Sequence, residues 1–115
     1  MRNLLTLLCM LSTNAALAQD VYGTANGCAR HGGAEVFADD IITFDGSVFE
    51  FQQSFCQVSS ETPHSDGQSL FALNCFGEGQ EWQLEYVIEE TDVSDRLIIF
   101  PIDTPEAREE INLCK

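Results

Sequence analysis

The sequence predicts an all-β domain, a small antiparallel meander that is barrel- or sandwich-like and stabilised by disulfide bonds. Short segments with alternating or continuous apolar residues recur along the chain, and turns rich in Gly, Asp and Ser separate them. Four cysteines follow the first 18 residues, and an even set of cysteines in a small exported domain is typical of a disulfide framework.

The first 18 residues are expected to form a Sec-type secretory signal peptide. Arg2 supplies a positive charge, residues 4–11 form a short apolar run, and Ala16-Leu17-Ala18 supplies small residues before a cleavage site after Ala18. The apolar run is shorter than the ~20 residues that a membrane-spanning helix needs. We therefore expect a periplasmic or secreted protein with no membrane insertion after cleavage, and a single small β domain over residues 19–115.

The stretch "ITFDGSVFEF" (42–51) predicts a β-hairpin. Asp45-Gly46 suits a tight turn, because Gly tolerates the positive φ that hairpin turns require. A loop of two residues places Ile42, Phe44, Phe49 and Phe51 on one face, which we expect to be a wall of the core.

The other elements follow in chain order. We expect an irregular leader over 19–33, a strand over 34–44 interrupted near Asp39-Asp40, a return strand over 47–58 with a bulge at 52–54, and a polar loop over 59–68. Strands are predicted over 70–76, 81–90 and 96–102, and Thr104-Pro105-Glu106 predicts a short helical turn before an extended tail. The side chains predicted to be largely buried are Phe44, Phe49, Phe51, Leu84 and Tyr86.

The cysteines Cys28, Cys56, Cys75 and Cys114 predict two disulfide bonds. A metal site is the alternative, but no pair of cysteines has the close spacing of a zinc-ligand knuckle. Four cysteines allow three pairings. The predicted hairpin register favours Cys28–Cys56 with Cys75–Cys114.

The charge is strongly acidic. All 19 acidic residues follow residue 18, and four basic residues oppose them, so the formal net charge of this part is −15 with neutral histidines. Such a surface repels nucleic acids and anionic lipids. Two explanations stay open, which are solubility and attraction to a cationic protein partner. For the second, we expect the contact at a loop that contains Glu89, Glu90, Asp92 and Asp95.

No catalytic constellation is predicted. Neither His31 nor His64 has a metal-binding companion, no Gly-x-Ser-x-Gly occurs, and oxidised cysteines leave no thiol nucleophile. The acidic stretches 39–45 and 89–95 do not match an EF-hand loop. We therefore expect no enzyme, no cofactor and no metal site. The alternatives are a small secreted hydrolase that uses exposed carboxylates and a structural or calcium-stabilised envelope protein.

The leading functional hypothesis is an exported, non-enzymatic domain that binds a protein or an envelope component. An exported, disulfide-bonded small β domain is similar in size and class to the periplasmic lysozyme inhibitors of Gram-negative bacteria. This resemblance implies an inhibitor of a cationic enzyme such as lysozyme. The Ser-Gly-x-x-Tyr loop motif of one such family does not occur in the chain, so no inhibitory residue is carried over.

Overall fold

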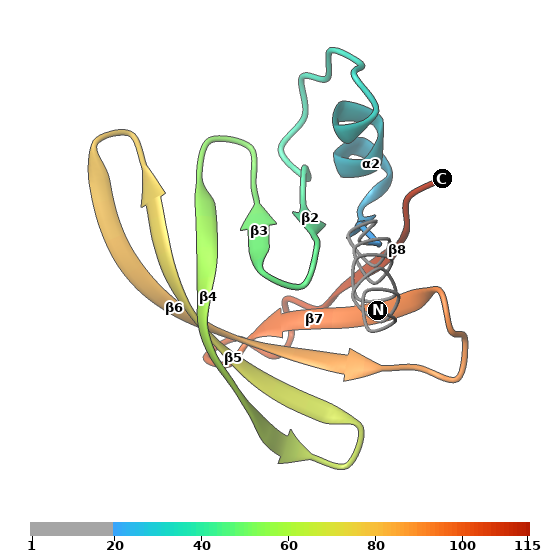
Figure 1. Ribbon diagram of the computed structural model, residues 1–115, viewed down its shortest axis with the longest axis vertical. Coiled ribbons are helices and arrows are strands. Elements are labelled where there is room, and N and C mark those ends of the chain that lie inside the picture. Colours follow the sequence, from blue (N-terminus) through green and yellow to red (C-terminus); the bar gives the residue numbers. More distant parts are fainter. Residues whose placement is uncertain (1–19) are drawn as a thin grey trace, which may run out of the picture.

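The computed structural model describes residues 20–115, which form a closed barrel of eight antiparallel strands (Figure 1). Each strand pairs with the next one in the chain, and β8 pairs with β1. The predicted all-β meander is therefore confirmed, in its barrel form. The predicted signal peptide lies outside the described residues. The strands are β1 (Tyr22–Gly23), β2 (Thr43–Phe44), β3 (Val48–Glu50), β4 (Phe55–Ser65), β5 (Gln68–Gly77), β6 (Gln80–Glu90), β7 (Arg96–Pro101) and β8 (Glu109–Leu113).

A short helix, α2 (Ala25–His31), follows β1. Thr24 caps its first turn, because the Thr24 hydroxyl accepts a hydrogen bond from the Gly27 N–H at 3.0 Å. Gly27 lies against the backbone of Ile42 so closely that no Cβ fits there. The prediction of an irregular leader is therefore wrong for residues 25–31, which form a helix that packs against the backbone of Ile42, just before β2.

The first hairpin, β2–β3, is confirmed. Its two-residue loop is Gly46-Ser47, one position later than predicted, and Gly46 has the positive φ of +97°. The Asp45 carboxylate holds this turn by accepting hydrogen bonds from the N–H groups of Ser47 and Val48, both at 2.8 Å. Phe44 and Phe49 are direct cross-strand partners, and their rings stack with centroids 4.2 Å apart.

The expected return strand over 47–58 is wrong, because the chain reverses between β3 and β4. The Phe51 N–H donates to the Ser54 carbonyl at 2.8 Å, and β4 then runs back antiparallel to β3. The change of alternation at residues 52–54 therefore marks a turn and not a bulge. The expected strand over 34–44 is also shorter, since only Thr43–Phe44 pairs in the sheet.

Long β-strands form the middle of the chain. The predicted polar loop over 59–68 is wrong, because β4 extends to Ser65 and turns at Asp66-Gly67. The strands predicted over 70–76, 81–90 and 96–102 are confirmed within a few residues as β5, β6 and β7. At Thr104 the chain makes a single turn, with the Ala107 N–H donating to the Thr104 carbonyl at 2.9 Å, and the tail pairs as β8.

Two disulfides are present, but the favoured pairing is wrong. Cys56 pairs with Cys75, and Cys28 pairs with Cys114. Cys56 and Cys75 are direct cross-strand partners on β4 and β5. Cys28 lies on α2, beside the β1–β8 seam, and the Cys114 N–H donates to the Val21 carbonyl at 2.8 Å.

The interior of the barrel is filled by side chains. Phe44 and Phe49 are buried as predicted, while Phe51 and Tyr86 are partly buried against the same core. The prediction for Leu84 is wrong, because this side chain is 36% exposed. The other buried members of the core are Ile42, Cys56, Phe71, Leu73, Cys75, Ile88, Ile99 and Ile111.

The two disulfides should differ in their response to reductant. Cys56 and Cys75 are fully buried, whereas Cys28 and Cys114 are partly exposed. We therefore expect a mild reductant to open Cys28–Cys114 first in the folded protein, as measured by alkylation and peptide mapping. This bridge joins residues 86 positions apart, so its loss should lower the free energy of unfolding by about 4 kcal/mol. Earlier alkylation of Cys56 or Cys75 would contradict the buried position. Without reductant, the unfolded domain should show no free thiol.

Candidate binding site on the barrel exterior

Four consecutive strands present one row of side chains to solvent. Glu50 on β3 pairs with Phe55 on β4, Phe55 with Phe76 on β5, and Phe76 with Glu81 on β6. Direct partners in an antiparallel sheet project to the same face. The adjacent row, which consists of Phe49, Cys56, Cys75 and Trp82, points inward. The period of two therefore requires the first row to face outward.

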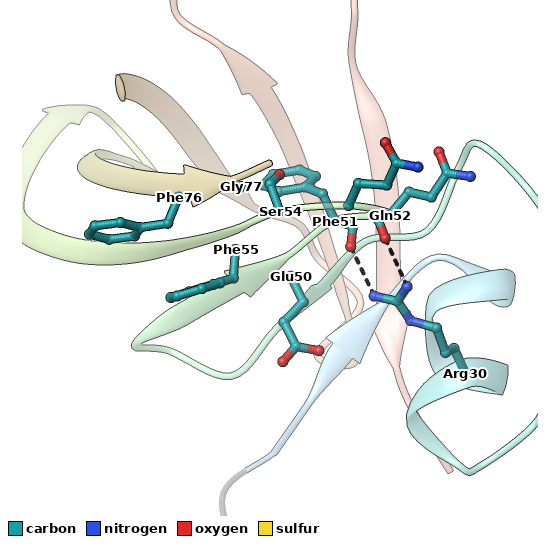
Figure 2. Close-up of a pocket in the computed structure, with 9 residues that line it drawn as sticks. Arg30, Glu50, Phe51, Gln52, Ser54, Phe55, Phe76 and Gly77 are labelled. Atoms are coloured by element: carbon teal, nitrogen blue, oxygen red, sulfur yellow. Dashed lines mark hydrogen bonds between the residues drawn. The ribbon is translucent and has the colours of Figure 1, made fainter. Parts of the chain in front are cut away.

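The centre of this outward row is an exposed aromatic pair. The rings of Phe55 and Phe76 stack with centroids 5.3 Å apart and an interplanar angle of 25°, and Figure 2 shows them lying face to face. Phe55 is 43% exposed, and Phe76 is partly exposed. An exposed stacked pair leaves apolar surface and ring faces available for a partner.

Carboxylates flank the aromatic pair on both sides. Glu50 and Glu81 are both exposed, and neither forms an ion pair among residues 20–115. We call the row Glu50–Phe55–Phe76–Glu81 the acidic-aromatic row. A ring face attracts a cation through its quadrupole, and a neighbouring carboxylate adds a Coulombic attraction. The arrangement is chemically suited to an arginine or lysine side chain.

The turn between β3 and β4 forms one wall of a groove beside this row. The groove has a volume of about 510 Å³ and is lined by Arg30, the residues from Glu50 to Phe55, Phe76 and Gly77. Arg30 on α2 holds the turn, because its guanidinium donates hydrogen bonds to the carbonyls of Phe51 at 2.8 Å and Gln52 at 3.1 Å (Figure 2). At Gly77 the turn approaches so closely that an added Cβ would lie 2.7 Å from the Gln53 carbonyl oxygen.

The four acidic residues predicted as a partner site differ in their surroundings. Glu89 accepts from Arg108 at 3.2 Å and from Gln68 at 3.0 Å, and the Asp95 carboxylate lies 3.7 Å from the ammonium group of Lys115. Glu90 and Asp92 are exposed and have no basic partner in the described part of the chain. Because Glu89 and Glu90 are consecutive on β6, their side chains point to opposite faces.

The hydrogen bond from Gln68 and the one from Arg108 hold the pKa of Glu89 below its ordinary value of 4.5. Arg108 also lies over the Phe100 ring, 5.1 Å from its centroid. The third ion pair joins Arg96 Nε to Glu110 Oε2 at 3.1 Å, with an angle unsuited to a hydrogen bond. Thus three basic side chains are neutralised near β6–β8.

The residues considered for catalysis are not brought together. Within residues 20–115, no group of three or more His, Cys, Asp or Glu side chains is placed to hold a metal ion. His31 ends α2 and His64 lies on β4, and both are exposed. The same part of the chain has no helix with the length and apolar character required to span a bilayer.

Comparison with known proteins yields no relative. No family model, no curated protein and no solved structure matches the chain.

Sequence reasoning missed the acidic-aromatic row. The available signal was Phe55 and Phe76, which lie next to the buried cysteines Cys56 and Cys75 and therefore face outward once those cysteines face inward. Phe37 is a further exposed aromatic, at 89%, in the segment between α2 and β2.

Replacing Arg30 should loosen the β3–β4 turn. We expect Arg30→Ala to expose the carbonyls of Phe51 and Gln52 and to lower the free energy of unfolding by about 2 kcal/mol, because hydrogen bonds to charged groups contribute about 1.5–3 kcal/mol. Amide exchange at residues 51–54 should accelerate while exchange in β5 stays unchanged. Unchanged exchange in the turn would contradict this role.

The low pKa of Glu89 predicts a small acid-dependent loss of stability. A carboxyl whose pKa is lower in the folded state stabilises that state above its unfolded pKa, and this contribution is lost as pH falls through the folded pKa. The free energy of unfolding should therefore decline less below about pH 4.5 in Glu89→Gln than in the parent. Urea unfolding at a series of pH values measures this, and equal slopes would contradict it. Glu90→Gln is the matched control.

Proposed function

We propose that the protein is an exported, non-enzymatic domain that binds a cationic protein. More specifically, we propose that it inhibits a basic enzyme such as lysozyme. The observation that carries the proposal is the acidic-aromatic row. Exposed apolar rings lower the solubility of a protein, and Phe55 and Phe76 are not members of the core cluster, so we explain their exposure by a partner.

The two disulfide bonds support export. Two disulfides in so small a domain are characteristic of an oxidising compartment such as the periplasm or the extracellular space. The signal-like residues 1–18 point the same way. All four cysteines of residues 20–115 are in disulfides, so this part offers no thiol nucleophile, which supports a binding role over catalysis.

The cationic nature of the partner is supported by the charge. An acidic domain attracts a basic partner over a long range and accelerates encounter, and this acceleration falls as salt is raised. Short-range selectivity then comes from groups that touch the partner. The stacked rings and the two carboxylates of the row provide both an apolar contact and a charge contact for an arginine or lysine.

Surface plasmon resonance with immobilised domain tests this function. Lysozyme should bind, an acidic protein of similar size should not, and the association rate should fall steeply with salt. Phe55→Ala should raise the dissociation rate roughly tenfold, because the loss of a cation–π and apolar contact costs about 1–2 kcal/mol. A cell-wall hydrolysis assay then shows whether binding inhibits the enzyme.

Two double variants with the same charge change separate contact from net charge. Glu50→Gln with Glu81→Gln removes two charges from the row, and Glu90→Gln with Asp92→Asn removes two from the end of β6 and the turn that follows it. We expect the first pair to weaken binding several-fold more than the second. A larger loss of binding in the second double variant would locate the contact at the predicted acidic loop. No binding to any basic protein would overturn the function and leave solubility as the account of the charge.

A further inference from the structure

The first half of β6 is an open sheet edge. β6 pairs with β5 along its length, but it pairs with β7 only from Tyr86 to Glu90. After Pro101 the chain turns away from β6, and the last contact is the Ile102 N–H donating to the Glu85 carbonyl at 3.0 Å. Figure 1 shows this half of β6 as the outermost strand beside β5. Residues 80–84 therefore lack a neighbouring strand on one side within the described structure.

The direction of the backbone groups at this edge follows from two hydrogen bonds. The Glu85 carbonyl faces β7, and the Glu90 N–H faces the β5 side, where it donates to the Gly67 carbonyl at 2.9 Å. Backbone groups alternate sides along a strand. The N–H and C=O groups of Glu81 and Gln83 therefore point to the open side, while those of Trp82 and Leu84 point to β5.

The barrel has a second open edge, and the two differ. Beyond Val58, β4 has no partner on its outer side among the described residues, but Pro63 and two register shifts interrupt it. Proline and irregularities are the devices by which sheets block pairing at an edge. β6 pairs with β5 over ten consecutive positions without a shift and contains no proline. Of these two edges, the edge of β6 is the one regular enough to accept another strand.

The side chains at this edge define what it accepts. Trp82 and Leu84 lie on the inner face and are both incompletely covered, with Leu84 36% exposed. Glu81 and Glu85 lie on the outer face, and Asp103 borders a cavity of about 390 Å³ beside Gln83 where β7 departs. An added strand with apolar residues on one face and basic residues on the other complements both faces.

A second copy of the chain is a poor occupant. Two β6 edges that pair with each other would bring the outer-face glutamates of one copy near those of the other, and like charges on paired strands destabilise a sheet. No basic residue lies on β6 to compensate.

We infer that the open edge of β6 binds an extended segment of a cationic partner as an added β-strand, with basic side chains over Glu81 and Glu85 and apolar side chains over Trp82 and Leu84. The inference rests on the proposed function for the charge of the partner. It adds main-chain hydrogen bonds to Glu81 and Gln83 as the means of binding. Glu81 belongs to both the edge and the acidic-aromatic row, so one segment is able to contact both.

Amide hydrogen exchange of the parent domain tests the inference directly. The probe is a short peptide in which arginine alternates with valine. At saturation it should slow exchange of the Glu81 and Gln83 amides at least tenfold, while the Trp82 and Leu84 amides, already bonded to β5, should change little. A peptide of alternating glutamate and valine is the control and should have no effect.

Substitution of Gln83 supplies an independent readout. Gln83→Pro removes an outward N–H without breaking a bond to β5, and should weaken peptide binding at least tenfold. Gln83→Ala removes the same side chain, including its hydrogen bond to Asn74, and should bind like the parent. Circular dichroism establishes that each variant is folded. If Gln83→Pro does not fold, Glu81→Pro and the exchange pattern of the parent replace it.

The outcomes separate this inference from the proposed function. Peptide binding without protection of Glu81 and Gln83, or equal binding by the proline and alanine variants, would overturn strand addition. The function would survive either result if lysozyme or another basic protein still bound. Absence of binding to every basic protein would remove the proposed function itself.

Discussion

The barrel depends on one short seam, where its first and last strands meet. β1 contributes only two residues, and it pairs with β8 through Tyr22–Leu113 and Gly23–Asn112. Two residue pairs are too few to hold a sheet closed against the conformational entropy of both chain ends. The Cys28–Cys114 disulfide supplies the missing constraint, because it joins the helix after β1 to the residue after β8. This closure completes the wall around the filled interior.

The same closure fixes the candidate site through α2. The disulfide and the Thr24 cap hold the helix, and the helix places Arg30 against the carbonyls of the β3–β4 turn. This β3–β4 turn packs on Gly77 at the end of β5, beside Phe76. A covalent bond at the seam is thus linked by direct contacts to the groove beside the acidic-aromatic row.

The sequence predicted those elements whose environment imposes a regular pattern. β6 alternates between the two faces and β5 is nearly all apolar, so both were recognisable. The outer half of β4 is exposed on both faces and has no periodic signal, so its sequence predicts a loop. The seven residues of α2 include Gly27, and Gly32 follows them as the C-cap. Glycine favours helix weakly, so tertiary packing rather than helix propensity forms α2.

The disulfide pairing and the site required register, which a single sequence does not contain. A shift of one residue in β4 would exchange Cys56 for Phe55 on the inner face. The turn at residues 51–54 determines which side chains of β4 face inward, and the sequence there predicts a bulge instead. The acidic-aromatic row joins residues from four strands, so it can be predicted only when the register of all three strand pairings is known.

The few basic residues of the described part of the chain are all engaged by other groups. Arg96, Arg108 and Lys115 pair with acids around β6–β8, and Arg30 is engaged by backbone carbonyls. The first half of β6 and the adjacent row therefore keep their carboxylates unpaired. At the open edge of β6, these unpaired carboxylates have two effects. They disfavour pairing between identical chains, which protects the solubility of a regular edge, and they favour a strand of opposite charge. If the proposed function holds, solubility and recognition are consequences of the same glutamates.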